Sequence, residues 1–132
     1  MIKIAVDAFG GDNSPAANVK GAVRAINEIN DLSIILVGDK TLIENELSGL
    51  EYDKTRISIE HASEVIDCNE KPTEAVKQKT DSSLVKAAAL IKGSDEINAL
   101  VSTGSTGAIL VCAVLKLGRI KGEIGRASCR ER

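Results

Sequence analysis

A chain of 132 residues that is 43% hydrophobic and 27% charged is long enough for one domain with a real core. Its net charge of −2 and its single Phe and Tyr give neither an electrostatic nor a stacking reason to expect nucleic acid as a partner. No apolar run approaches the roughly 20 residues that cross a bilayer, and no signal peptide precedes the first predicted strand. Three widely spaced cysteines indicate a reducing cytoplasm and no zinc site.

Short apolar runs alternate with segments of helical periodicity along the chain. The first strand is predicted over 2–6, and a helix follows with Ser14 as its cap and Pro15 at its first position. The further predictions, in chain order, are a strand over 32–37, a helix over 41–50, a strand over 56–60, helices over 70–78 and 84–92, a strand over 99–101 and a buried helix over 108–115. This alternation predicts an α/β fold with a mostly parallel sheet and helices on both faces.

A hydroxyl- and glycine-rich turn precedes the last predicted helix. Gly104 and Gly107 lack the Cβ atoms that would keep an anion from the backbone, and Ser105 and Thr106 are typical helix-capping residues. The free N–H groups of the helix start suit a phosphate or a developing oxyanion. The alternative is that the turn only caps the helix. Because its glycines do not have the Gly-x-Gly-x-x-Gly spacing, no dinucleotide is indicated and no cofactor is expected.

A second glycine-rich turn follows the first predicted strand. Gly10 and Gly11 would let its backbone approach the same pocket, while Asp7 and Asp12 could orient a substrate, hold a metal or fix the loop. An Asx turn formed by Asp12 or Asn13 is an equally good interpretation. Both turns follow the carboxyl ends of strands, where parallel sheets bind ligands. They form one crevice only if the two strands are neighbours.

Several other side chains have both a functional and a structural interpretation. His61 ends the third predicted strand and is a weak candidate for a general acid, although a lone histidine is more often a surface residue. Cys112 lies in an apolar helix and is expected in the core. The lysines of two neighbouring helical segments form either a solvated face or a docking patch for an acidic partner: Lys71, Lys77, Lys79 and Lys86.

Six segments occur together in the order typical of one family. They are Ile4-Ala-Val-Asp-Ala-Phe-Gly-Gly-Asp-Asn-Ser-Pro15, His61-Ala-Ser-Glu-Val-Ile66, Lys71-Pro-Thr-Glu-Ala-Val76, Asp81-Ser-Ser83, Val101-Ser-Thr-Gly-Ser-Thr-Gly-Ala108 and Leu117-Gly-Arg-Ile-Lys-Gly122. Over residues 1–122 the chain therefore resembles the bacterial phosphate acyltransferases of phospholipid synthesis. It departs from them at Phe9, where the family usually has Met, and at Ser105, where it usually has Asn.

The resemblance implies a three-layer α/β/α sandwich similar to those of isopropylmalate dehydrogenases and phosphate acetyltransferases. The implied reaction moves an acyl group from acyl-acyl-carrier-protein to inorganic phosphate, without a cofactor or a metal. Phosphate or oxyanion contacts would come from Gly10, Gly11, Gly104, Ser105, Thr106 and Gly107, and the weak catalytic candidates are Asp7, Asp12 and His61. The family is usually a cytoplasmic homodimer with peripheral membrane contact.

The resemblance also implies that the chain is the truncated N-terminal part of a longer enzyme. On this interpretation residues 123–132 are a foreign tail, the membrane contact belongs to the absent part, and the 132 residues alone are inactive. The alternative from the residues alone is a flavodoxin-like or receiver-like module, in which Asp7 and Asp12 form an acidic pocket that binds phosphate or Mg²⁺.

Overall fold

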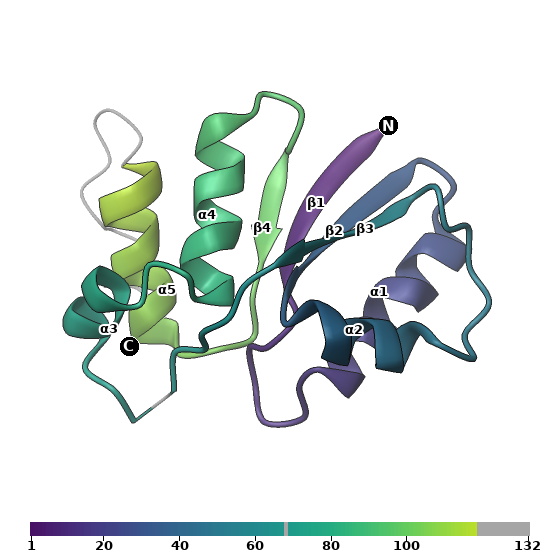
Figure 1. The fold of residues 1–132 in the computed structure, drawn as a ribbon. Helices are drawn as coiled ribbons and strands as arrows, with labels where there is room; N and C mark the ends of the chain where they lie inside the picture. Colours follow the sequence, from purple (N-terminus) through teal and green to yellow (C-terminus); the bar gives the residue numbers. More distant parts are fainter. Residues whose placement is uncertain (68, 119–132) are drawn as a thin grey trace.

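Four parallel strands form the centre of the molecule in the order β3-β2-β1-β4 (Figure 1). The computed structural model describes residues 1–67 and 69–118. The elements are β1 (Ile2–Asp7), α1 (Ala16–Glu28), β2 (Leu32–Gly38), α2 (Lys40–Leu47), β3 (Ile57–His61), α3 (Pro72–Gln78), α4 (Ser83–Gly93), β4 (Ala99–Val101), α5 (Thr106–Cys112) and the π-helical turn η1 (Ala113–Leu117). This confirms the predicted parallel α/β fold. Within the described part of the chain, no helix has the length and apolar character needed to span a membrane.

Helices cover both faces of the sheet because successive strand residues point to opposite sides. On one face α1 and α2 pack on the strands, and this core includes Val19, Ile26, Ile34, Leu36 and Ile43. On the other face α4 packs on the strands, and this core includes Ala5, Ile35, Val37 and Ala87. A third cluster joins α3, α4 and α5 beside the sheet. The three layers agree with the predicted sandwich (Figure 1).

The sheet changes its direction of growth at β1. After β3 has been added beyond β2, the chain returns and places β4 on the opposite side of β1, with Ile4 opposite Ala99 and Val6 opposite Val101. Such a reversal leaves a crevice at the carboxyl ends of the two strands, where ligands bind in open parallel sheets. The neighbouring strands are therefore the two that carry the glycine-rich turns.

Two of the departures from the predicted helices have local reasons. The helix predicted over 41–50 ends at Leu47, and Gly49 then adopts a φ of +88°. The first helix begins at Ala16 without a side-chain cap, because the Ser14 hydroxyl donates instead to the carbonyls of Phe9 and Gly11, 3.1 Å from each. The prediction that Ser14 caps this helix was therefore wrong. By contrast, Ser82 caps α4 by accepting from the N–H of Val85 at 3.3 Å.

The last helix is less buried than its apolar sequence predicts. Cys112 is in the core as predicted, and burial raises the pKa of its thiol. However, Leu110, Val114 and Leu115 are 40%, 38% and 49% exposed. The expectation of a buried helix fails for these three residues because they line an open pocket beside Thr73 and Lys77 of α3, and no described element fills it.

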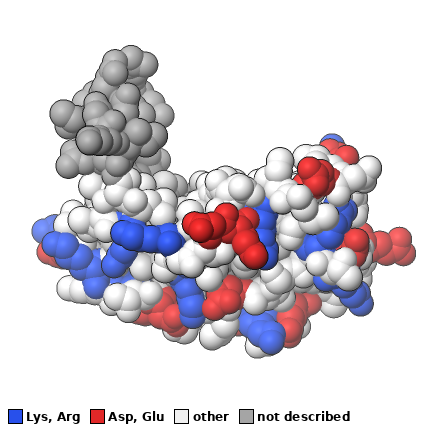
Figure 2. Space-filling view, turned by 90° about the horizontal axis from the view of Figure 1, so that it is seen from above, with Lys and Arg blue, Asp and Glu red and all other residues white. Residues whose placement is uncertain are grey.

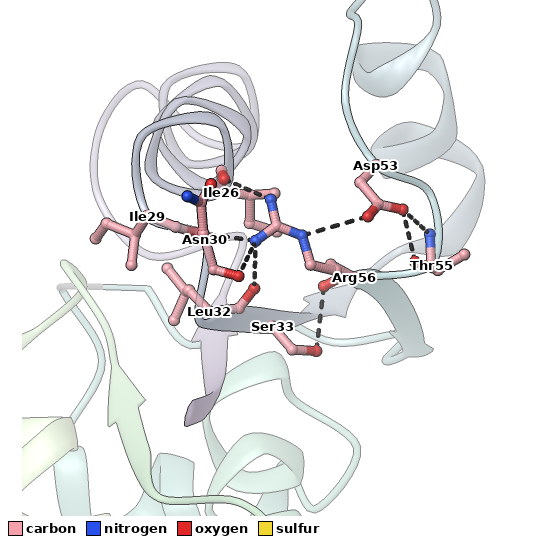
Figure 3. Close-up of polar contacts among 8 residues, drawn as sticks. All are labelled: Ile26, Ile29, Asn30, Leu32, Ser33, Asp53, Thr55 and Arg56. Carbon is pink, nitrogen blue, oxygen red and sulfur yellow. Dashed lines mark hydrogen bonds and ion pairs between the residues drawn. The ribbon is translucent and has the colours of Figure 1, made fainter. Parts of the chain in front are cut away.

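At the β3 edge of the sheet, one arginine side chain joins the start of β3 to the end of α1 (Figure 3). Arg56, at the start of β3, donates from Nη1 to the carbonyls of Ile29 and Asn30, both at 2.9 Å, and from Nη2 to that of Ile26 at 2.6 Å. Its side chain is 14% exposed, and its Nε lies 3.5 Å from a carboxylate oxygen of Asp53. A cation thus satisfies one carbonyl in the last turn of α1 and two just after it, where the helix dipole favours positive charge.

Candidate functional site

The two glycine-rich turns lie against each other at the carboxyl ends of β1 and β4. A Cβ atom on Gly10 would lie 2.7 Å from the backbone nitrogen of Gly104. A Cβ atom on Gly11, whose φ is +89°, would lie 2.9 Å from Oγ1 of Thr103. Glycine is required at both positions by this close approach and, at Gly11, by the backbone conformation as well. The two turns therefore form one crevice.

Asp7 holds the two turns together from the end of β1. It is only 4% exposed, and its Oδ1 accepts from the N–H of Phe9 at 3.1 Å. Its Oδ2 accepts from the Ser102 hydroxyl at 2.9 Å, and that hydroxyl oxygen in turn accepts from the N–H of Gly104 at 3.2 Å. Both carboxylate oxygens are engaged within the protein. This geometry agrees with the interpretation that Asp7 orders the first turn.

Two further side chains fix the first turn through its carbonyl oxygens. The Asn18 amide, on α1, donates to the carbonyls of Asp7, Ala8 and Gly10 at 3.3, 2.9 and 2.7 Å. Thr103 donates to the same Gly10 carbonyl at 3.0 Å. Buried carbonyls need such partners, and here the partners come from α1 and from the segment after β4. The crevice is consequently preorganised by contacts from both of these segments.

Sequence reasoning missed Asn18, Ser102 and Thr103 as parts of this site. Ser102 and Thr103 had a usable signal, because they are polar residues that directly follow a strand beside a glycine-rich turn. Asn18 had none, because a single asparagine in an amphipathic helix is usually solvated. Only the tertiary structure brings its amide to three carbonyls of another segment.

The second turn leaves backbone donors open at the start of α5. Ser105 caps this helix by accepting from the N–H of Ala108 at 3.3 Å. The N–H groups of Thr106 and Gly107 have no acceptor among the described residues, and the Thr106 side chain is exposed. A Cβ on Gly107 would come within 2.8 Å of Pro72 Cγ, so this glycine is explained by packing against α3. The open N–H groups and the Thr106 hydroxyl are what an anion would contact.

Gly104 is different from the other turn glycines. A Cβ placed there would make only an ordinary contact, 3.4 Å from the Cα of Gly10 at the nearest. It would also point toward Asp7 and the first turn, 3.9 Å from the carboxylate Oδ2. An alanine at this position is therefore compatible with the packing, whereas a branched side chain would press on Gly10 and Asp7.

Asp12 and His61, unlike Asp7, do not bond to both glycine-rich turns in the described structure. The Asp12 side chain is exposed, and the loop before α1 is closed by the Ser14 hydroxyl rather than by an Asx turn of Asp12 or Asn13. His61 is exposed at the end of β3, which β2 separates from β1. Its Nδ1 accepts from the N–H of Lys40 at 3.1 Å, so it contacts the start of α2.

A separate polar cluster joins the loop after β3 to the start of α4. Asp81 accepts from both the hydroxyl and the N–H of Ser63 and pairs with Lys86 at 3.1 Å. Hydrogen bonds from Ser63, followed by that from Lys86, lower the pKa of the Asp81 carboxyl to about 2. These contacts join two of the segments that the sequence singled out, which begin at His61 and at Asp81.

The lysines of α3 and α4 are partly neutralised. Lys79 pairs with Glu70 at 2.8 Å, and this hydrogen bond lowers the pKa of the Glu70 carboxyl. Lys86 pairs with Asp81, while Lys71 and Lys77 are exposed. Figure 2 shows blue and red side chains intermixed across the face seen from above. Over residues 1–67 and 69–118, no three His, Cys, Asp or Glu side chains converge as metal ligands would.

Comparison with known proteins places the chain among its relatives. The family model described as "Fatty acid synthesis protein" matches residues 2–129. Phosphate acyltransferases of Clostridium perfringens strain SM101 and Dictyoglomus turgidum are each 48% identical over 121 residues. That of Clostridioides difficile strain 630 is 44% identical over 121 residues. The alignments cover 92% of this chain and 35% of each relative.

The chain belongs to the fatty acid synthesis protein family, which confirms the resemblance drawn from its six segments. It spans about a third of the length of these curated relatives, all of which are called phosphate acyltransferases. The prediction that 123–132 is a foreign tail concerns residues outside the described part. It stays a prediction.

Proposed function

We propose that the full-length protein transfers a fatty acyl group from acyl-acyl-carrier-protein to inorganic phosphate and so supplies acyl-phosphate for phospholipid synthesis. The observation that carries this proposal is the rigid crevice between β1 and β4, with open N–H groups at Thr106 and Gly107. The family's description and the name phosphate acyltransferase of the relatives support the same chemistry.

In this reaction a phosphate oxygen attacks the thioester carbonyl. The new oxygen–carbon bond first gives a tetrahedral oxyanion. As this oxyanion collapses, the carbon–sulfur bond breaks, and the carrier thiolate takes the proton of the hydrogen phosphate and leaves as the thiol. Phosphate is already a nucleophile near neutral pH, so the protein mainly aligns the two reactants and stabilises the tetrahedral oxyanion. The N–H groups of Thr106 and Gly107 and the Thr106 hydroxyl would serve phosphate or the oxyanion. Asp7 would act through its hold on both turns, since a carboxylate repels phosphate.

The partners and the setting belong to the same proposal. The acyl donor is an acyl-carrier protein in the cytoplasm, the working enzyme is a homodimer, and any peripheral membrane contact comes from outside the region matched here. Because the chain spans 35% of the relatives' length, we expect it to be inactive alone. Activity must therefore be measured in a chimera, in which residues 1–122 are continued by the corresponding remainder of the Clostridioides difficile relative.

The test removes the one exposed hydroxyl of the second turn. In the chimera, Thr106→Ala should lower the rate of acyl-phosphate formation by about ten- to a hundredfold, equivalent to about 1–3 kcal/mol for a lost hydrogen bond to the transition state. Thr106→Ser keeps the hydroxyl and should retain most of the rate. Thr73→Ala, in the first turn of α3, is the matched control. The rate is followed against phosphate concentration, with a melting curve for every variant.

Two outcomes would contradict the proposal. If the chimera folds but forms no acyl-phosphate from any acyl donor, the reaction is wrong. If Thr106→Ala keeps a normal rate and a normal dependence on phosphate, the second turn is only a helix cap. Ser105→Asn, which restores the residue typical of the family, should leave activity unchanged or raise it.

A further inference from the structure

An open apolar groove of about 290 Å³ lies beside α1, on the face of the sheet that α1 covers. Its floor is formed by residues of β1, β2 and β4. Val6 and Val101 are register partners on its floor, and Val101 is 46% exposed. Asp7 is the only ionisable residue among those that line the groove in the described part of the chain. Walls that are apolar over most of their length, with a few polar groups at one place, are typical of small-molecule sites.

Small residues on α1 keep this groove open. Ala17, Gly21 and Ala25 follow one another at a spacing of four and so lie along one side of the helix, facing the groove. A Cβ added at Gly21 would find no atom within 4 Å, so the space beside it is empty. Glycine inside a helix is less stable than alanine, and no close contact in the described structure requires it here.

One end of the groove is the candidate site itself. The polar lining residues are Asp7, Asn18, Ser102 and Thr103, and they include the groups that lock the two glycine-rich turns. They lie at the carboxyl ends of β1 and β4, whereas Ile4 and Leu32 line the groove toward the other end of the strands. The apolar floor therefore leads into the crevice without an intervening charged side chain.

We propose that the groove holds the hydrocarbon chain of the acyl substrate. The reacting carbonyl lies beside Thr103 and Gly104, and the chain extends along β1 and β4 toward Ile4. This assignment rests on the proposed function and adds the binding site for the acyl chain. It follows from the continuity of an apolar, uncharged groove with the place where the acyl carbon must meet phosphate. Packing by another polypeptide segment or by a second copy is the competing use of such a surface.

Binding is tested on the chain as it stands, with alkyl phosphates from butyl to hexadecyl as probes. Each buried methylene contributes about 0.8 kcal/mol, so affinity should rise by about fourfold per methylene until the groove is full and then level off. Amide chemical shifts of β1, β4 and α1 report the site. Gly21→Leu fills the groove and should move the levelling point to shorter chains. Gly93→Leu is the matched control, because it also enters open space on a helix.

Rates in the chimera separate this inference from the proposed function. With Gly21→Leu, short acyl donors should keep their rate and long donors should lose about tenfold or more, while Gly93→Leu should leave the chain-length profile unchanged. Equal profiles in the two variants, in an active chimera, would overturn the groove assignment. A fall in the chimera's melting temperature for Gly21→Leu alone would also overturn it, because polypeptide would then fill the groove. A chimera inactive with every donor would contradict the proposed reaction. The groove assignment would then be decided by the binding of the alkyl phosphates.

Discussion

Apolar side chains are buried to different extents at the two edges of the sheet. At the β3 edge α2 packs on β3 and on α1, and its Ile43 and Leu47 are buried. At the other edge, β4 has a neighbouring strand on one side only among the described residues, and Leu110 and Leu115 on α5 and η1 are 40% and 49% exposed. An apolar sequence therefore does not make a buried helix. Burial needs an element that covers the face, and the described residues supply one for α2 but not for this side of α5.

The largest expected effect contrasts truncations at the two edges. Ile43→Ala, on α2 at the β3 edge, removes a fully buried side chain and should lower the free energy of unfolding by about 2–5 kcal/mol, because it leaves a cavity. Leu110→Ala should lower it by less than about 1 kcal/mol, because that side chain is already partly in water. Urea unfolding followed by circular dichroism gives both values. Equal losses would mean that the two edges are equally well packed.

Removal of the arginine at the β3 edge should have the next largest effect. Arg56→Ala leaves the carbonyls of Ile26, Ile29 and Asn30 without their charged donor and should lower the free energy of unfolding by about 2–3 kcal/mol. Arg24→Ala is the control, because Arg24 forms only an exposed pair with Glu28 worth about 0.3–0.5 kcal/mol. Thermal unfolding should separate the two variants clearly. Similar melting temperatures would show that the Arg56 contacts add nothing to stability.

A smaller effect is expected when the pH is lowered, because Asp81 joins the loop after β3 to the start of α4. The pKa of Asp81 is lowered to about 2 in the folded protein from an ordinary 3.8, so ionised Asp81 favours folding above pH about 4. That contribution is lost as the pH falls from about 4 to about 2. Asp81→Asn cannot ionise, so its melting temperature should fall less steeply over this range than that of the wild type. Parallel curves would contradict the assigned Ser63 and Lys86 contacts.

The smallest effect is expected at the chain's end. Deletion of 123–132 should leave the melting temperature unchanged within about 2 °C, because this segment has no apolar periodicity with which to pack. Differential scanning calorimetry of the full and shortened chains is the measurement. A clear drop would show that the segment packs on the domain, and the interpretation as a foreign tail would then be abandoned.

The sequence by itself determined the order and kind of the elements. Apolar periodicity and capping residues are local properties, so the strands, the parallel α/β class and the position of both glycine-rich turns at strand carboxyl ends followed from them. It also placed Cys112 in the core, for the same reason.

Only the tertiary structure decided which of these pieces meet. The strand order puts β4 beside β1 and so joins the two turns, while it leaves His61 on the outermost strand. Ser14 bonds the loop instead of capping α1, and Asn18 reaches three carbonyls, because each finds partners that the fold brings within reach. Strand order and these contacts depend on residues far apart in the sequence, and local patterns carry no information about such pairings.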